Sequence, residues 1–503
     1  MIPFNELIND NLPALVVIVP LLGGLFATFL GRFAWMWSTL ITGTVFALSY
    51  TLFTAVDSGP PLHYEFGNWP SLWGIGLRID LLNAFILLVV SGVAFLATIY
   101  AKLSVEDEIP GDRHNFFYSV WLLAITGLLG ITITGDAFNV YVLLEISSLT
   151  IYALIAMGKD RDPRALTASL RYLILGSVGA SFILLGIGYL LMVTGTLNMA
   201  DMHAQLMALP EPTQNRTILV AFAFLMVGLS LKMALFPLHT WLPKAYTFAP
   251  SAVTAMVAAT ATKVGVYMAF RFLFTIFGYK FTFVDMPSYH ILIICAAVGI
   301  VITGLSAIRQ TNAKKLLAYS SVGQIGYIVA GFALANPQGV AGSLVHIFNH
   351  AAMKGGMFMA LGAVAYRLGG TSMKDLRGLG KTMPLTAGCL TAGALGLIGF
   401  PLTAGFISKW YLVQGALAAD SWLLAFTILF GSLLAVIYSW KMIEAMYFRE
   451  PEGKNAEATE APYMLVLPTM AMIAISIYFG IDAEFTAGTA LKAAAVLLPG
   501  GAP

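Results

Sequence analysis

The chain alternates long apolar runs with short polar stretches along its whole length. Fourteen runs can be counted, and each could form a helix of about 20 residues, which crosses the roughly 30 Å hydrocarbon core of a bilayer. They cover approximately residues 12–30, 34–54, 81–103, 116–134, 138–157, 167–194, 217–239, 250–277, 289–308, 316–336, 340–365, 385–417, 422–447 and 462–482. The pattern predicts an all-α polytopic membrane protein with about fourteen transmembrane helices and no soluble domain.

Composition agrees with a membrane location. Of the 503 residues, 59% are hydrophobic and 10% are charged, whereas soluble domains carry about 25% charged residues. The first run is not predicted to be a cleaved signal peptide, because Met1–Asn11 contains Glu6 and Asp10 but no Lys or Arg. Cys295 and Cys389 both lie in apolar runs, which argues against a disulfide framework and against a zinc or iron–sulfur site.

The distribution of basic residues predicts the orientation in the membrane. If the N-terminus lies outside, the inner loops collect seventeen Lys and Arg residues, and the outer loops collect only Arg78, Arg216, Arg271, Lys280 and Lys492. Inner loops of membrane proteins carry the excess of Lys and Arg, so we expect both termini on the outer side. The outer segment Pro60–Arg78 alternates polar and aromatic residues around Gly and Pro, which predicts a short hairpin at the surface.

Three pairs of segments resemble each other in the same order. FPLHTWLPK (236–244) resembles FPLTAGFISK (400–409), SSLTIYALIAMG (147–158) resembles SSVGQIGYIVAG (320–331), and KVGVYMAFR (263–271) resembles KMIEAMYFR (441–449). These pairs relate span five to ten, seven to twelve and eight to thirteen. Because five spans is an odd number, the copies would be inverted relative to each other, as in many transporters.

Two prolines are predicted to interrupt spans at matching positions of this repeat. Pro237 cannot donate to the carbonyl of Met233, and Pro401 cannot donate to the carbonyl of Leu397, so helices seven and twelve should break there. Backbone groups freed at membrane depth must be satisfied by protein or by a watery cavity. An ordinary proline kink is the alternative at either position, but two matching breaks favour paired broken helices.

Polar and charged residues recur inside the apolar runs, although a charge at the bilayer centre costs roughly 2.5–3.5 kcal/mol on insertion scales. Helical spacing groups them as Tyr141, Glu145, Ser148 and Tyr152 on span five, Lys232 near the break of span seven, Thr260, Lys263 and Tyr267 on span eight, His346, His350 and Lys354 on span eleven, and Lys409 after the break of span twelve.

These groups have two interpretations. Glu145 and a lysine could form a static ion pair that fixes helix packing, although such pairs often stabilise little. Alternatively, the groups form a proton relay, in which a lysine beside a movable carboxylate loads and releases a proton, and histidines pass protons between the halves. We favour the relay for Glu145, Lys232, Lys263, His346, His350, Lys354 and Lys409. His239, in the break of span seven, is left open, and Asp136 fits a helix cap better than a collector of cations.

At these residues the sequence resembles a known family. The segments FNVYVLLEISSLTIYALIA, GLSLKMALFPLHTWLPKAYTFAPSAVTA, ATKVGVYMAFRF, KKLLAYSSVGQIGYIVAG and HIFNHAAMKGGMF resemble the proton-translocating subunits shared by respiratory complex I and Mrp-type multisubunit sodium/proton antiporters. The similarity covers about residues 80–450, and its details are most similar to the D-type subunits of the Mrp-type antiporters.

This resemblance implies a fold of fourteen helices with inverted five-helix repeats in spans 4–8 and 9–13. Residues 1–115 would then hold three helices and the outer hairpin, residues 116–280 and 281–450 the two repeats, and residues 451–503 a helix and a tail. It also implies that Glu145 and Lys232 form the ion pair of the family, and that Lys263, the span-eleven group and Lys409 continue the relay. Relatives often have His in the span-ten stretch where this chain has Gln324, so no proton role is assigned there.

We therefore expect a subunit of a monovalent cation (Na⁺)/H⁺ antiporter in the bacterial inner membrane, acting with other membrane subunits, without a cofactor and without nucleic acid. Its substrates would be H⁺ and Na⁺, and it would not be an enzyme. The sequence shows no nucleotide-binding or redox motif and no set of ligands for sodium. The alternatives are a proton-pumping subunit of a quinone oxidoreductase or membrane-bound hydrogenase, a silent scaffold subunit, and a self-sufficient transporter.

Overall fold

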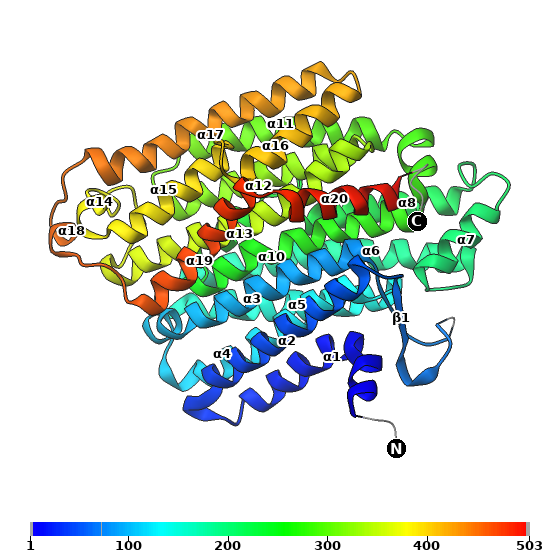
Figure 1. The fold of residues 1–503 in the computed structure, drawn as a ribbon, viewed down its shortest axis with the longest axis horizontal. Coiled ribbons are helices and arrows are strands. Elements are labelled where there is room, and N and C mark those ends of the chain that lie inside the picture. The colour runs from blue at the N-terminus through cyan, green and yellow to red at the C-terminus, as the bar shows by residue number, and fades with distance from the viewer. Residues whose placement is uncertain (1–3, 72, 499–503) are drawn as a thin grey trace.

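The computed structural model describes residues 4–71 and 73–498 and is almost entirely helical. Long helices lie side by side along one direction (Figure 1). The helices are α1 (Phe4–Ala27), α2 (Ala34–Asp57), α3 (Leu81–Glu108), α4 (His114–Ile133), α5 (Ala137–Ala156), α6 (Arg164–Thr194), α7 (Met199–Ala208), α8 (Arg216–Lys232), α9 (Leu242–Phe248), α10 (Ser251–Phe270), α11 (Ser288–Ile308), α12 (Ala313–Ala333), α13 (Pro337–Leu368), α14 (Leu379–Thr382), α15 (Pro384–Ile398), α16 (Ala404–Ala418), α17 (Trp422–Phe448), α18 (Lys454–Glu457), α19 (Tyr463–Ile481) and α20 (Glu484–Leu497).

Every apolar run of the sequence overlaps at least one of these helices. Within the described residues, ten helices are long and apolar enough by themselves to cross a membrane. The remaining four expected spans miss that criterion for physical reasons. The apolar part of α1 is short, and the helix of span seven ends early, at Lys232. Span twelve is divided into α15 and α16, and α13 carries His346, His350 and Lys354 along its length.

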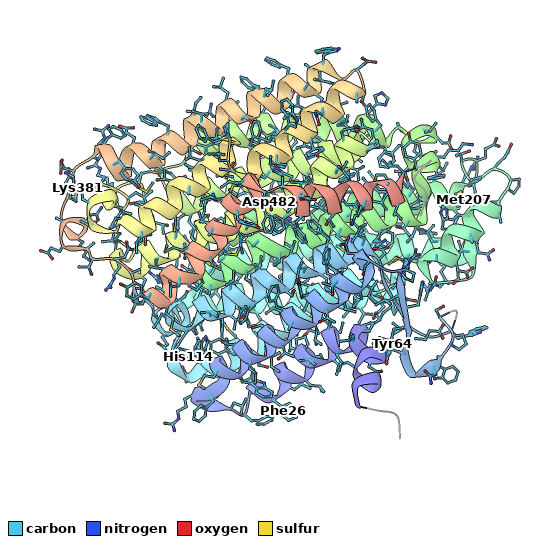
Figure 2. The ribbon with its side chains drawn as sticks, in the orientation of Figure 1. Phe26, Tyr64, His114, Met207, Lys381 and Asp482 are labelled. Carbon is cyan, nitrogen blue, oxygen red and sulfur yellow. The ribbon has the colours of Figure 1, made fainter. Side chains whose placement is uncertain are left out.

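The two ends of the bundle carry different connections. Strands β1 (Leu62–Glu65) and β2 (Gly76–Ile79) form the antiparallel hairpin that the sequence predicts, with Leu62 opposite Ile79. In Figure 1 this hairpin and α7 lie toward one end of the bundle, and α14 and α18 lie toward the other. Figure 2 likewise places Tyr64 and Met207 at one end and His114 and Lys381 at the opposite end.

The C-terminal region differs from the expected helix and tail. After α19 the chain turns at Asp482 and forms a further helix, α20, which packs against α13 and α3. Its segment, EFTAGTALKAAAVL, is shorter than a membrane span and rich in small residues, so it is not counted among the apolar runs of the sequence. Alanine favours helix, and the small side chains allow α20 to lie close to α13.

The interior of the bundle is formed mainly by α10, α12 and α13. The first two are buried over nearly their whole length, and most of α13 is buried as well. α13 packs against both α10 and α12, and it also contacts α15, α16, α19 and α20. The polar residues that the sequence places on α10, α12 and α13 are therefore enclosed by protein rather than exposed to lipid.

Candidate functional site

The first group of polar residues surrounds the end of α8. Lys232 is buried, and its Nζ donates a hydrogen bond to Ser148 Oγ of α5 at 3.0 Å. The direct ion pair expected between Lys232 and Glu145 is absent, because the ion pairs among the described residues, counted up to 4.0 Å, do not include Glu145. The hydrogen bond of the lysine goes instead to the serine, which lies about one turn along α5 from Glu145.

Glu145 is half-buried, and its Oε1 is buried without a hydrogen-bond partner among the described residues. The same stripe of α5 continues to Tyr152, whose hydroxyl lies against Gly176 of α6. A Cβ at Gly176 would clash with Tyr152 Oη, so only glycine leaves room for this hydroxyl. The stripe therefore presents an acid, a hydroxyl that binds Lys232, and a phenol along one helix face.

The interruption after Lys232 extends from Met233 to Trp241, and Pro237 lies within it. The regular helical donor for the carbonyl of Leu231 is lost, because Leu235 N donates to Ser230 at 2.9 Å, and Trp241 Nε1 turns back to donate to Leu231 at 3.0 Å. A protein side chain thus helps to satisfy the end of the broken helix.

His239 lies in the same break. Its ring stacks on that of Phe236, with the ring centres 5.3 Å apart. Its Nδ1 is buried without a hydrogen-bond partner in the described part of the chain. His239 therefore lies in the break that follows Lys232, and no hydrogen bond or ion pair among the described residues connects it to Lys232 or Glu145.

Lys263 is fully buried in α10. Its Nζ donates to the carbonyl of Ala258 and contacts Thr262 Oγ1 at 3.5 Å. No carboxylate forms an ion pair with it among the described residues, so its nearest polar partners are uncharged oxygens of its own helix. α10 packs against α5 and α8 and also against α13, so Lys263 lies on the helix that connects the first group with the residues of α13.

His346, His350 and Lys354 of α13 are 0% exposed and recur every four residues. Lys354 Nζ donates to the carbonyl of Leu317 at 3.0 Å and to Ser320 Oγ, both on α12. The rings of His346 and His350 lie with centroids 6.2 Å apart and nearly parallel. Both ring nitrogens of His350 are buried without a hydrogen-bond partner in the described structure.

Lys409, in α16, lies at the second interruption. The backbone between α15 and α16 covers Gly399 to Thr403, includes Pro401, and has positive φ angles at Gly399 and Leu402. Lys409 Nζ donates to the carbonyls of Leu397 and Ile398 at 2.8 and 3.0 Å and to Ser432 Oγ at 2.8 Å. Its ammonium also lies 4.8 Å from the ring centre of Tyr327.

Two side chains of the candidate site, Gln324 and Ser408, were not proposed from the sequence. Gln324 Oε1 lies 2.8 Å from His346 Nε2, and Ser408 Oγ lies 2.8 Å from His346 Nδ1. An amide and a hydroxyl in apolar helices do not titrate, so no proton role was predicted for either, although Gln324 occupies the span-ten position where relatives often have His. The pairing of Gln324 and Ser408 with a buried histidine becomes visible only in three dimensions.

Asp136 has the structural role that the sequence favours. Its carboxylate accepts from the backbone N–H of Asn139 at 2.6 Å and caps α5. Burial raises the pKa of this carboxyl against the opposing effect of its backbone hydrogen bonds. Within the described residues, no group of three or more His, Cys, Asp or Glu side chains is arranged to hold a metal ion.

The fold and these buried groups define a class: an integral membrane protein in which lysines, histidines and hydroxyls line broken and unbroken helices in the interior. The family model for the transmembrane region of NADH:quinone oxidoreductase and Mrp antiporter subunits matches residues 134–435. The chain belongs to this family of antiporter-like membrane subunits.

Individual relatives represent both branches of the family. The chain is 40% identical to NADH-quinone oxidoreductase subunit N of Desulforudis audaxviator over 92% of this chain and 93% of that protein. It is 28% identical to the D-type subunit of the Na(+)/H(+) antiporter of Alkalihalophilus pseudofirmus, over 94% of each.

Two solved structures have the same fold. A chain of the archaeal membrane-bound sulfane sulfur reductase complex matches with a TM-score of 0.88 and 31% identity, and the match covers 97% of each chain. A chain of the Mrp complex from a Dietzia species also matches with a TM-score of 0.88, at 25% identity and the same coverage. Both belong to multisubunit membrane complexes, and the chain is a multi-pass membrane protein of this kind.

Proposed function

We propose that this chain is a proton-translocating membrane subunit of a respiratory, complex I-like oxidoreductase. The main support is the series of buried lysines and histidines that runs from α8, beside Glu145 and Ser148 of α5, through α10 and α13 to α16. Sequence identity supports a redox-driven complex. The chain is 40% identical to an NADH-quinone oxidoreductase subunit N but only 28% identical to a D-type subunit of a sodium/proton antiporter. This reverses the preference that the sequence motifs suggest by themselves.

In this proposal a proton moves laterally along Lys263, the α13 group and Lys409, and the Glu145–Lys232 region controls its release. Lys232 uses one of its three N–H donors on Ser148, so it can also approach Glu145, whose Oε1 has no hydrogen-bond partner among the described residues. A change of that contact alters the field on Lys263, because charges in a low-dielectric interior interact over several ångströms. The chain carries no redox group in this proposal, and the driving energy comes from partner subunits.

We further propose two inverted repeats in residues 116–280 and 281–450, with fourteen spans in total. Matching backbone contacts support the repeat. Ala137 N donates to the carbonyl of Leu197 at 2.9 Å, and Ala313 N donates to the carbonyl of Thr371 at 2.8 Å. α6 and α13 both end in a left-handed glycine, Gly195 and Gly369. The helices that follow, α7 and α14, lie at opposite ends of the bundle, as inversion requires (Figure 1).

The orientation with both termini outside, in a bacterial inner membrane, completes the proposal. It places the hairpin and α7 on the outer side and the loops around Lys381 on the inner side, in agreement with the excess of basic residues in the inner loops.

The exposed carboxylate of Asp482 supports the presence of a neighbouring subunit, and its depth follows from the packing of nearby Gly480. Gly480 packs so closely on Thr403 that a Cβ would clash with the Thr403 backbone, and Thr403 lies midway between two 15-residue helices. Asp482, two residues later, is exposed near the middle of the molecule (Figure 2). A carboxylate facing lipid at that depth is costly, so we propose that a partner subunit covers it.

A sodium/proton antiporter subunit is the second candidate, and the similarity to a chain of the Mrp complex favours it. The two candidate functions predict different partner subunits for this chain. A redox-driven complex would purify with subunits that carry electron-transfer groups, whereas an antiporter would purify with small antiporter subunits that carry none.

The test is to tag the chain, purify its complex and reconstitute it in proteoliposomes with a pH-sensitive dye. An electron donor and a quinone should drive proton translocation, and Glu145→Ala or Lys232→Ala should reduce it at least tenfold without loss of assembly. Proton movement that depends on a sodium gradient and not on electron transfer would establish the second candidate. Full translocation in both variants would refute the relay in either form.

A further inference from the structure

His346 is enclosed by two side chains that can each donate or accept a hydrogen bond. Its Nε2 faces Gln324 Oε1 of α12 and its Nδ1 faces Ser408 Oγ of α16, both at 2.8 Å. All three side chains are buried. Ser408 Oγ also lies 3.0 Å from the carbonyl of Gly405, which provides a second acceptor for the single hydroxyl hydrogen.

This arrangement accommodates each protonation state of the imidazole. With a proton on Nδ1 only, Ser408 accepts, and Gln324 rotates its amide to donate to Nε2. With a proton on Nε2 only, Ser408 donates to Nδ1 and the Gln324 oxygen accepts. In the imidazolium, Ser408 donates to Gly405 and accepts from Nδ1, while the Gln324 oxygen accepts from Nε2. Because an amide oxygen and nitrogen exchange places by rotation, no state leaves a ring nitrogen unpaired.

His350 provides the contrast within the same helix. It is equally buried, yet neither of its ring nitrogens has a protein partner among the described residues. An unpaired buried polar group is costly, so a change of protonation costs differently at the two rings. Hydrogen bonds to protein side chains therefore hold the ring of His346 in one orientation, whereas the ring of His350 has no such bonds among the described residues.

We infer that Gln324 is a positioning residue for the proton relay, which together with Ser408 keeps His346 oriented while one proton is gained at one nitrogen and one is lost at the other. The inference rests on the proposed function, and it gives α12 a role that the sequence did not assign. Gln324 also connects to the rest of the relay. It lines a small cavity with Ser320 and Tyr438, and Ser320 Oγ accepts from Lys354.

The test compares replacements of Gln324 in the assembled complex in proteoliposomes. Gln324→Leu removes both hydrogen-bonding functions at similar size and should lower proton translocation at least tenfold. Gln324→His retains a donor and an acceptor and should keep it within about threefold of wild type. Gln324→Glu is nearly isosteric, but its carboxylate can only accept, so translocation should fall and its pH profile should move by about one unit.

Gln414→Leu is the matched control, because Gln414 lies on the exposed face of α16, and it should leave translocation unchanged. Assembly is checked by co-purification and thermal unfolding of each variant. If Gln324→Leu fails to assemble, the Glu and His variants still decide the question. A Glu variant with wild-type rate and pH profile would overturn the inference, as would an assembled Leu variant with wild-type translocation. If Lys232→Ala also kept full translocation, the proposed function itself would fail; loss in that variant alone would leave the function standing without a role for Gln324.

Discussion

A buried ion pair at the C-terminal end of α10 gives a quantitative test of the fold. Asp80, the N-cap of α3, accepts from Arg271 Nη2 at 2.6 Å, and the two side chains are 12% and 8% exposed. Arg271 Nε also donates to Tyr267, whose hydroxyl donates to the carbonyl of Thr132. The pair therefore joins α3, α4 and α10 through one network, about two helical turns from Lys263.

Removing one member should be much worse than removing both. Asp80→Asn leaves the guanidinium without its counter-charge and should destabilise the protein by about 3–5 kcal/mol, the range for broken buried pairs. Asp80→Asn combined with Arg271→Met removes both charges and should recover most of that loss. Asp57 and Lys492 provide the control, because their exposed ion pair should contribute about 0–1 kcal/mol at most.

The same pair predicts a dependence on pH. Burial would raise the pKa of Asp80, but the Arg271 guanidinium and the hydrogen bonds outweigh it, so the pKa lies below its ordinary value. A carboxyl with a lowered pKa stabilises the folded state above the unfolded pKa and loses this contribution as the pH falls through the folded pKa. Stability should therefore not change through Asp80 between about pH 5 and 8 and should decline only below about pH 4.

The measurement is thermal unfolding of the purified protein in detergent, followed by intrinsic fluorescence across this pH range. Asp80→Asn should lower the midpoint at neutral pH and should remove the part of the acid-induced decline that comes from this pair. A single variant as stable as wild type would refute the reasoning, and so would a double variant whose loss equals the sum of the two single losses.

Three further predictions concern the second helix break, a close helix contact and the exposed Asp482. Lys409→Arg should keep the contacts at the α15–α16 break and much of the stability but lower proton translocation at least tenfold, because arginine does not release its proton; equal translocation would contradict this. Gly176→Ala should destabilise by about 1–3 kcal/mol through its clash with Tyr152, whereas Gly188→Ala, which has nothing within 4 Å, should not destabilise; thermal unfolding compares them. Asp482→Cys should react with a maleimide in the isolated chain and be protected in the complex; equal labelling would argue against a partner at this surface.

Much of the fold follows from patterns of short range. Apolar runs locate the membrane helices because each helix must satisfy its backbone internally. Pro237 and Pro401 lie within the two interruptions because a proline removes a donor whatever its surroundings. The cap at Asp136 is equally local, since the side chain binds the backbone three residues later.

The rest of the candidate site depends on contacts between distant segments. Ser148 and Lys232 are 84 residues apart, and only their packing shows that a hydroxyl binds the lysine where a direct ion pair was expected. Arg271 counts as an outer basic residue in the sequence, yet Asp80, 191 residues away, holds it in the interior. Gln324 carries no charge, so its significance comes only from its distance to His346.

The two broken helices satisfy their freed carbonyls in different ways, which separates the roles of the halves. At the first break the neutral indole of Trp241 supplies a donor, and Lys232 bonds to Ser148 of another helix instead. At the second break Lys409 itself supplies the donors, to two carbonyls and to Ser432. An ammonium has three N–H groups for these three acceptors, whereas an amine has two. Loss of the Lys409 proton would therefore require the Ser432 hydroxyl to turn from the carbonyl of Ile428 and donate to the amine, which couples the charge of this lysine to the contacts between α16 and α17.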